Sequence, residues 1–189
     1  PNGYSLFIII SILVSISFAP ILLSVSPTPA FERTKPMSLA QLFRSSPLGC
    51  VGMFLLGGVF SAQFGMSAVF GSQIGLSLSK ISLFVAAFYI GAMIFQYPIG
   101  WMSDRMDRRL LILLISASSA GGSVFAYFAG DYFFALVFAA FLVGGLSNPL
   151  YSLIIAHAND LIEYEDMASA AAGLLFVNGI GAISGPLII

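Results

Sequence analysis

The sequence contains very few charged residues. Lysine, arginine, aspartate and glutamate together make up 8% of its 189 positions, whereas hydrophobic residues make up 59%. A typical soluble domain has about a quarter of its residues charged, so no water-soluble domain of this length could cover so much apolar surface. Seven basic residues and a net charge of -1 cannot form the basic surface that nucleic acids require, so we expect no nucleic-acid partner.

Cysteine and histidine are almost absent. Cys50 is the only cysteine and His157 the only histidine, so the chain cannot by itself form a disulfide, a Cys/His zinc site or a bis-histidine haem site. We therefore expect no cofactor and no metal site. The sequence also has no nucleophile with a base nearby and no Gly-rich phosphate loop, so we do not expect an enzyme. Cys50 is expected to be an inert packing residue, and His157 to meet interfacial water at a helix end.

Long apolar runs make up most of the chain. A transmembrane helix needs about 20 mostly apolar residues to cross about 30 Å of hydrocarbon, where only a helix satisfies its own backbone groups. The first run has no basic n-region and exceeds the usual signal-peptide core of about 7–15 residues, so we interpret it as a true span. The sequence predicts an all-α, polytopic integral membrane bundle of about six transmembrane helices, over residues 4–24, 48–74, 81–102, 110–129, 132–156 and 167–189.

The charged residues lie almost entirely in the connections between these spans. Six of the seven basic residues fall in the first and third connections, whereas only Lys80 falls in the second. By the positive-inside rule, the first and third connections are cytoplasmic, and strict alternation places the acidic fifth connection on the same side. The six residues are Arg33, Lys35, Arg44, Arg105, Arg108 and Arg109.

The first connection, residues 25–47, is the longest. Pro27, Pro29 and Pro36 argue against a regular helix in its first half, so we interpret it as a linker between two bundles. Ser38 is expected to cap a short turn near the membrane surface. The apolar residues of that turn are expected to face the lipid boundary; they are Leu39, Leu42 and Phe43.

Small residues recur at helical spacing within two spans. In lipid, such stripes allow helix backbones to approach closely, because lipid tails remove the usual hydrophobic drive for association. We expect tight helix packing at these positions, which also leaves room for sliding between helices. They are Gly57, Ser61, Gly65, Ala68 and Ser72 in the second span, and Gly173, Gly181 and Gly185 in the last.

The third connection contains the most specific motif, Gly-x-x-x-Asp-Arg-x-x-Arg-Arg over residues 100–109. Any one of its arginines could be merely a topology signal, but the ordered set between two helices resembles the cytoplasmic signature of the major facilitator superfamily, Gly-x-x-x-Asp-Arg-x-Gly-Arg-Arg/Lys. In that family the signature follows the second helix and often recurs after the eighth. Asp107 stands where the family usually has glycine, which changes the expected turn because aspartate adopts positive φ less readily.

The resemblance extends along most of the chain. The last span carries Gly181-x-x-x-Gly185-Pro186, similar to the family's glycine-proline motif, and residues 42–52, 96–109 and 148–160 resemble a little-characterised bacterial branch. The register implies helices six to eleven: residues 1–24 end the N-terminal half, 25–47 form the cytoplasmic linker, and 48–189 form a C-terminal bundle lacking its last helix. Because both ends look like cuts, we expect part of a longer protein or an incompletely traced one.

The resemblance also implies where a solute cavity would lie, because helices one, four, seven and ten line it in the family. Polar residues inside spans are costly and tend to face a cavity or a partner. Pro149 is expected to kink helix ten, and kinked or broken helices often mark binding sites. The candidates are Gln63, Ser67 and Gln73 on helix seven and Ser147, Asn148 and Tyr151 on helix ten, with Gln96 and Asn178 as weaker ones. An interhelical hydrogen bond is the alternative for each, and we predict that Gln63 and Asn148 face the same interior space.

A cytoplasmic gate is the second site that the resemblance implies. Its residues are Gly100, Asp104, Arg105, Arg108 and Arg109 of the motif, with Asp160 and Glu163 after helix ten. Arg105 or Arg108 is expected to contact one of these two acids. Asp104 is expected to face a helix start in the other half of the transporter, where the helix dipole favours an anion. The alternative is that the arginines only anchor topology and touch lipid phosphates.

These observations favour a secondary active transporter of the major facilitator type, which moves a small solute by alternating access in the bacterial inner membrane. The alternative is a truncated transporter-like chain that serves as a structural or assembly subunit of a larger membrane complex. The expected partners are membrane lipid, the missing N-terminal half or partner membrane subunits, and a small-molecule solute.

Overall fold

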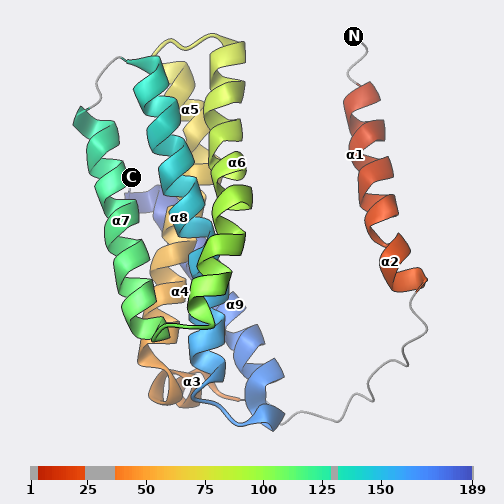
Figure 1. Cartoon of the computed structure of the whole chain (residues 1–189), viewed down its shortest axis with the longest axis vertical. Coiled ribbons are helices and arrows are strands. Elements are labelled where there is room, and N and C mark those ends of the chain that lie inside the picture. The colour runs from red at the N-terminus through yellow and green to blue at the C-terminus, as the bar shows by residue number, and fades with distance from the viewer. Residues whose placement is uncertain (1–3, 24–36, 129–131, 189) are drawn as a thin grey trace. The chain divides into compact units, whose positions relative to one another are not determined.

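The computed structural model describes residues 4–23, 37–128 and 132–188, which are helical and contain no strand (Figure 1). Six helical stretches in these ranges are long and apolar enough to cross a membrane. They confirm the predicted all-α bundle and its number of spans, with boundaries shifted by a few residues. The stretches run over Tyr4–Leu22, Pro47–Gln73, Leu78–Ser103, Arg108–Phe128, Phe133–Asn159 and Tyr164–Ile188.

The chain divides into two units at Arg33. The first contains α1 (Tyr4–Ser17) and α2 (Ala19–Leu22), and neither helix buries any residue. Pro20 stands in the first turn of α2, where its missing N–H would have no intrahelical acceptor. The apolar, uncovered surface of α1 suits a helix whose surroundings are hydrocarbon rather than water.

The second unit is the bundle. It contains α3 (Leu39–Ser45), α4 (Pro47–Phe60), the π-helical segment η1 (Ser61–Met66), α5 (Ser67–Gln73), α6 (Leu78–Ser103), α7 (Arg108–Phe128), α8 (Phe133–Asn159), the short η2 (Tyr164–Asp166) and α9 (Met167–Ile188). The segments α4, η1 and α5 follow one another without a break and form a single rod. A buried apolar core joins α3, α4, α6, α7, α8 and α9, centred on Leu42, Met53, Leu111 and Leu174.

Two helix pairs pack through glycine. In the pair α4–α9, a Cβ added at Gly57 would collide with the carbonyl oxygen of Asn178, and one at Gly181 with that of Phe54. The pair α6–α8 repeats this arrangement through Gly91 and Gly144, which lie against backbone of the partner helix. Such close approach needs residues without side chains. The tight packing predicted at Gly57, Gly181 and Gly185 is confirmed, since Gly185 lies against Gly58. The same prediction is wrong for Gly65, Ala68 and Ser72, which are exposed.

The two pairs are related by an internal sequence repeat. Residues 54–58 of α4 read Phe-Leu-Leu-Gly-Gly, and residues 141–145 of α8 read Phe-Leu-Val-Gly-Gly. In each repeat the first glycine of the Gly-Gly pair touches the neighbouring helix, α9 for α4 and α6 for α8. Thus α4 with α9 corresponds to α8 with α6. Helix α7 packs along α8 in addition (Figure 1).

Helix α3 differs from the prediction made for it. Ser38 caps it as expected: its Oγ accepts from Gln41 N (3.3 Å), while Ser38 N donates to Gln41 Oε1 (3.0 Å). Leu42, however, is 1% exposed and belongs to the bundle core, so the prediction that it faces lipid is wrong. Its side chain lies where a Cβ on Gly173 would go. Pro27 and Pro29, like the rest of the linker up to residue 36, lie outside the described residues.

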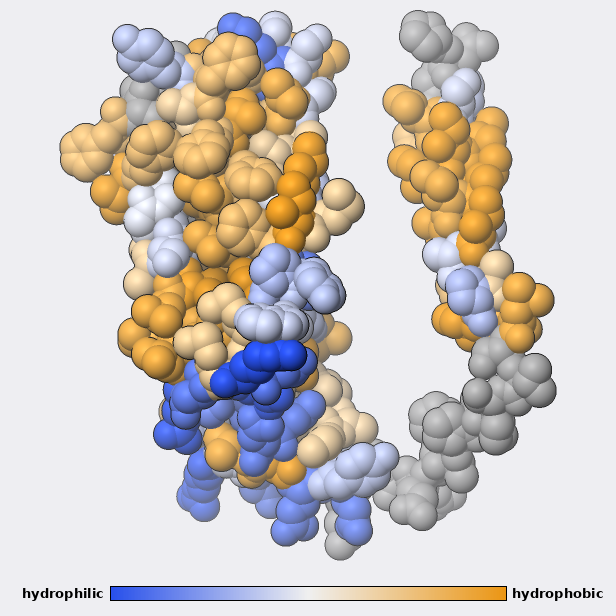
Figure 2. All heavy atoms as spheres, in the orientation of Figure 1, coloured by the Kyte–Doolittle hydropathy of each residue, from blue (hydrophilic) through white to orange (hydrophobic). Residues whose placement is uncertain are grey.

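Charged residues gather at one end of the bundle. Helix α3, the α6–α7 turn and the α8–α9 connection lie at the same end, and Figure 2 shows hydrophilic residues concentrated there. This arrangement agrees with the predicted shared side of the first, third and fifth connections. Lys80 lies at the opposite end, with its Nζ 5.2 Å from the ring centroid of Phe133.

Candidate functional site

The buried polar residues of the α4–η1–α5 rod lie at or directly after its π-helical segment η1. Single π turns inside α-helices are often found at functional sites. Gln63 in η1 and Ser67 at the start of α5 are four residues apart, and both are buried, with 5% and 6% exposure. Residues four apart also share a face in a regular α-helix, so the common direction of Gln63 and Ser67 can be read from the sequence, whereas the wider turn cannot.

Gln63 joins the rod to α8. Its Nε2 donates to Ser147 Oγ over 2.7 Å, and Ser147 is 1% exposed. The hydrogen bond therefore joins a predicted cavity residue on helix seven, Gln63, to one on helix ten, Ser147. Ser67, the next predicted residue on helix seven, lies one turn further along the same face as Gln63. Gln63 Oε1 and Ser67 Oγ have no hydrogen-bond partner within the described part of the chain, although both atoms are buried. Buried polar atoms without partners are rare in native proteins.

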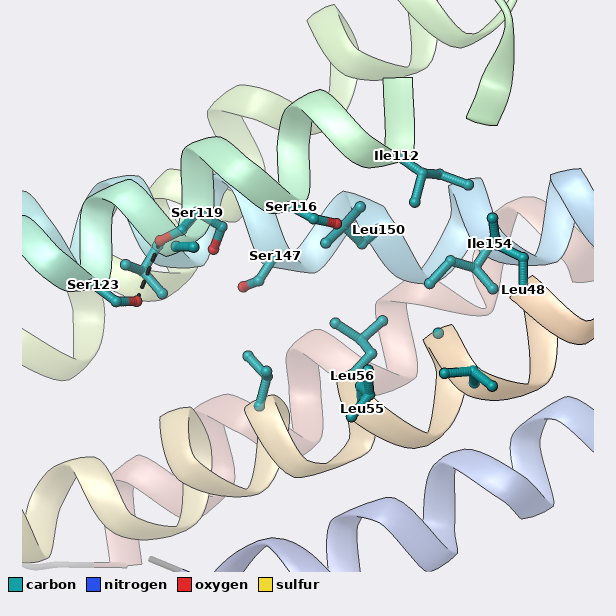
Figure 3. Close-up of a pocket in the computed structure, with 15 residues that line it drawn as sticks. Leu48, Leu55, Leu56, Ile112, Ser116, Ser119, Ser123, Ser147, Leu150 and Ile154 are labelled. Atoms are coloured by element: carbon teal, nitrogen blue, oxygen red, sulfur yellow. Dashed lines mark hydrogen bonds between the residues drawn. The ribbon is translucent and has the colours of Figure 1, made fainter. Parts of the chain in front are cut away.

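These residues border two neighbouring cavities. Gln63 and Ser67 line one of about 440 Å³ among η1, α5, α6, α7 and α8. Ser147 lines a second of about 590 Å³ among α4, α7 and α8. Figure 3 shows Ser147 and the serines of α7 across this space from Leu55 and Leu56 of α4. The serine row of α7 was not among the predicted site residues, although its spacing of three and four is readable in the sequence: Ser116, Ser119 and Ser123.

The remaining cavity candidates lie apart from this group. Asn148 donates to Gly144 O of its own helix over 2.9 Å and lines neither cavity, so the structure brings Ser147, not Asn148, to Gln63. Gln73 is exposed at the end of α5, and Gln96 is exposed on α6. Asn178 donates to Met53 O over 2.9 Å, the interhelical bond given as the alternative. Helix α8 continues through Pro149.

Tyr151 belongs to a chain of aromatic rings that was not predicted from the sequence. Its ring stacks on Phe60 with centroids 6.4 Å apart. Phe60 is followed by Phe64 at 5.7 Å, and Phe64 by Tyr89 of α6 at 5.1 Å. Phe64 and Tyr89 remain substantially exposed, so the chain presents aromatic faces on the surface of α4, η1, α6 and α8.

The α6–α7 turn uses Asp107 as a helix cap. Its Oδ1 accepts from Arg109 N (2.8 Å) and Leu110 N (3.1 Å) at the start of α7. No described residue other than glycine has a positive φ. The substitution of the family's glycine by aspartate therefore produces a capped turn without left-handed backbone.

Arg108 makes the predicted contact across the charged end of the bundle. Its guanidinium forms an ion pair with Asp160 at the end of α8 and also donates to Ala156 O (3.3 Å) and Ser103 Oγ (3.3 Å). The Arg108 side chain is 27% exposed and that of Asp160 is 51% exposed, so this network is partly desolvated. The expected contact between the arginine loop and the acids after helix ten is present.

The other gate candidates do not join this network. Arg105 lies over the ring of Trp101 at 4.0 Å and donates to Trp101 O (3.1 Å). No ion pair involving Asp104, Arg109 or Glu163 occurs among the described residues, and all three side chains are exposed. Gly100 is exposed too, and a Cβ there would meet nothing within 4 Å. His157 is 5% exposed inside α8, so its expected contact with interfacial water is wrong.

A family model described as the Major Facilitator Superfamily matches residues 49–189. The chain belongs to the Major Facilitator Superfamily. Similar proteins include the uncharacterised MFS-type transporters YE1530 of Yersinia enterocolitica (28% identity, 76% of this chain and 36% of that protein), YfkF of Bacillus subtilis (26%, 85% and 41%) and YcaD of Escherichia coli (26%, 82% and 39%). No solved structure matches the chain.

These relatives confirm the resemblance to a little-characterised branch of the superfamily. The chain spans about two fifths of the length of the relatives that it matches. It is a membrane protein of the Major Facilitator Superfamily, as predicted.

Proposed function

We propose that this chain is part of a secondary active transporter that moves a small solute by alternating access in a bacterial inner membrane, with residues 48–189 forming helices seven to eleven. The observation that carries the proposal is the contact of Arg108 with Asp160 at the charged end of a bundle whose helices pack through glycine. A closely packed bundle is suited to rocking as a unit against a second bundle, and the ionic contact links the start of α7 to the end of α8 within it. The bacterial relatives support the location.

The proposed gate is the network of contacts made by Arg108. The free energy of this network determines how strongly it can favour one conformation. One exposed bridge contributes only about 0–1 kcal/mol, whereas removing one member of a buried pair costs more because it leaves the other charge without compensation. With hydrogen bonds to Ala156 and Ser103 as well, this partly desolvated network biases one conformation and still opens within a transport cycle. Asp104, Arg105, Arg109 and Glu163 remain candidates for contacts in other conformations.

For the solute we propose the aromatic side of the bundle. Tyr151 and the three rings that follow it offer a platform to which Asn148, three residues before Tyr151 on α8, adds an amide. Gln73 lies at the far end of the same rod. Gln63, Ser67 and Ser147 are directed instead into the cavities beside α7, so their contribution to solute binding is through helix placement. Membrane lipid and an N-terminal half or partner membrane subunits would complete the transporter.

Two measurements test this function. First, the purified full-length protein is screened for thermal stabilisation by small solutes, because binding to the native state raises apparent stability by mass action. The solute so identified should be taken up into proteoliposomes, and Tyr151→Ala should weaken its binding at temperatures where the unliganded variant remains folded. A protein that binds no solute and co-purifies in fixed ratio with other membrane subunits would favour the assembly role, for which the comparisons offer no support.

The second measurement addresses the gate. Arg108→Asp and Asp160→Arg should each reduce uptake, and the double variant should recover a substantial part of it. Arg44→Asp, a charge reversal on exposed α3 at the same end, is the matched control and should transport normally. If the double variant is no better than the single ones while all remain folded, the ion pair does not act as a gate.

A further inference from the structure

Four aromatic rings form one continuous platform, although they come from three separate parts of the bundle. Phe60 and Phe64 lie on the rod, Tyr151 on α8 and Tyr89 on α6. The planes of Tyr151 and Phe60 are inclined by 28° and those of Phe64 and Tyr89 by 29°, so each of these two pairs is stacked. Phe64 and Tyr89 are 38% and 56% exposed. This aromatic platform therefore offers flat ring surface whose rings hold one another in place.

The position of Tyr89 distinguishes the platform from ordinary lipid-facing aromatic surface. Tyrosines of membrane proteins gather at the two interfaces, where the hydroxyl reaches water. Tyr89 lies instead near the middle of α6 (Leu78–Ser103), and its hydroxyl has no hydrogen-bond partner among the described residues. A hydroxyl that faces hydrocarbon finds no partner there, which is costly. We therefore expect the platform to face a space that holds polar groups, as a solute cavity does.

The platform has polar groups but no charge. No lysine, arginine, aspartate or glutamate occurs in residues 45–79, 81–103 or 132–159, which contain all four rings. An ionised group of a solute would lose its hydration here without meeting an opposite charge from these helices. The part of a solute that contacts the platform is therefore uncharged.

Asn148 supplies a hydrogen-bond acceptor beside the platform. It lies three residues before Tyr151, on the same side of α8, and is half-buried. Its Nδ2 donates to Gly144 O over 2.9 Å, whereas its Oδ1 has no partner within the described ranges. This oxygen can accept from an N–H or O–H group. A sugar carries hydroxyls around its whole ring, and one amide with the hydroxyls of Tyr89 and Tyr151 would leave most of them unpaired.

On the basis of the proposed transport function, we infer that the solute is a planar, uncharged aromatic or heteroaromatic molecule with an N–H or O–H group at its edge. Its ring stacks on the aromatic platform, and its edge group donates to Asn148 Oδ1. Aromatic rings attract one another in offset or tilted arrangements, which the rings of the platform already adopt among themselves.

Four probes test this solute class. The compound 2-quinolone is planar and uncharged and has an N–H group, whereas 1-methyl-2-quinolone lacks that group, N-methylquinolinium is a cation and methyl glucoside is a sugar. Binding of each probe to the intact, full-length transporter is measured in lipid nanodiscs. We expect 2-quinolone to bind about threefold or more tightly than each of the others. Equal or tighter binding of the cation or the sugar would overturn the inference and leave the proposed function intact.

Two variants locate the binding. Tyr89→Leu removes the flat ring but keeps an apolar side chain, so it should weaken the binding of 2-quinolone about 3–10-fold. Tyr97→Leu is the matched control and should bind like wild type, because Tyr97 is on the same helix and 80% exposed but does not belong to the platform. Asn148→Ala should weaken 2-quinolone by a similar factor and leave the binding of 1-methyl-2-quinolone unchanged, which a merely structural role of Asn148 would not do.

Failure of this inference is distinguishable from failure of the proposed function. If the transporter takes up a solute but binds neither quinolone, or if Tyr89→Leu binds 2-quinolone as tightly as wild type, the solute class is wrong and transport stands. If the protein binds no solute at all in the wider thermal screen, the proposed function is contradicted, and the solute class with it.

Discussion

The carboxylate of Asp107 accepts two backbone N–H groups at the start of α7, in the position where the family signature has glycine. Replacing a capping aspartate by alanine typically costs about 1 kcal/mol, whereas glycine costs only a few tenths. We predict that Asp107→Ala lowers the free energy of unfolding by about 1 kcal/mol. Asp107→Asn and Asp107→Gly should remain close to wild type, as measured by denaturation of the purified transporter.

This prediction separates capping from charge. Asn retains an acceptor oxygen but removes the negative charge, so a loss of stability in Asp107→Asn equal to that in Asp107→Ala would show that the charge matters and the cap does not. The cap could have been predicted from the sequence, because Asp at the residue before an apolar helical run is a common N-cap. Comparison with the family signature instead predicted an altered turn at Asp107, because the signature has glycine there.

Individual contacts were predictable where charge dictated them. Arg108 and Asp160 are complementary charges on connections at the same end of the bundle, and they meet. Asn148 and Ser147 are adjacent, and nothing in the sequence says which of them faces Gln63. That choice depends on the rotation of α8 about its axis, and a helix that is apolar all round has no polar face to indicate its rotation.

At the scale of helices, the glycines of α9 provide a matched pair for testing the packing of α4 against α9. A side chain at Gly181 collides with backbone of α4, whereas one at Gly179 meets nothing within 4 Å. We predict that Gly181→Ala destabilises the protein by about 1–3 kcal/mol or more through overpacking. Gly179→Ala should be neutral or slightly stabilising, because alanine restricts the unfolded backbone. Similar losses of stability in the two variants would contradict the close approach of these helices.

The existence of the helices could be predicted from composition, because six apolar runs of sufficient length have no alternative structure in a membrane. Their internal irregularities could not. The π turn at Ser61–Met66 replaces regular helix within a single predicted span, and no proline marks it. The burial of Leu42 likewise depends on the space above Gly173, which is a property of the folded bundle.

At the scale of the whole molecule, the internal repeat relates two of the helices to each other, and the charged residues mark one end of the bundle. The Phe-Leu-x-Gly-Gly repeat is visible in the amino-acid sequence, and its two copies are enough to predict that α4 corresponds to α8. The bundle has a charged end where Arg108 pairs with Asp160, an aromatic side, and two cavities beside α7.

The positions of the acidic residues lead to a prediction about energy coupling. All eight acids of the sequence lie in connections or at span ends, and none lies in the central part of an apolar span. Proton relays in membranes generally use buried acids. If the transporter is proton-driven, we therefore expect its titrating carboxylate to lie outside these 189 residues.

Replacing each acid singly by its amide should leave uptake dependent on the pH gradient, even where Asp160→Asn slows uptake by weakening the gate. The ratio of protons to solute, measured in proteoliposomes, distinguishes the two effects, because a gate variant changes the rate and a coupling variant changes the ratio. Uptake by Asp160→Asn or Glu163→Gln that no longer responds to the pH gradient would place the coupling acid in this part of the chain and refute the prediction.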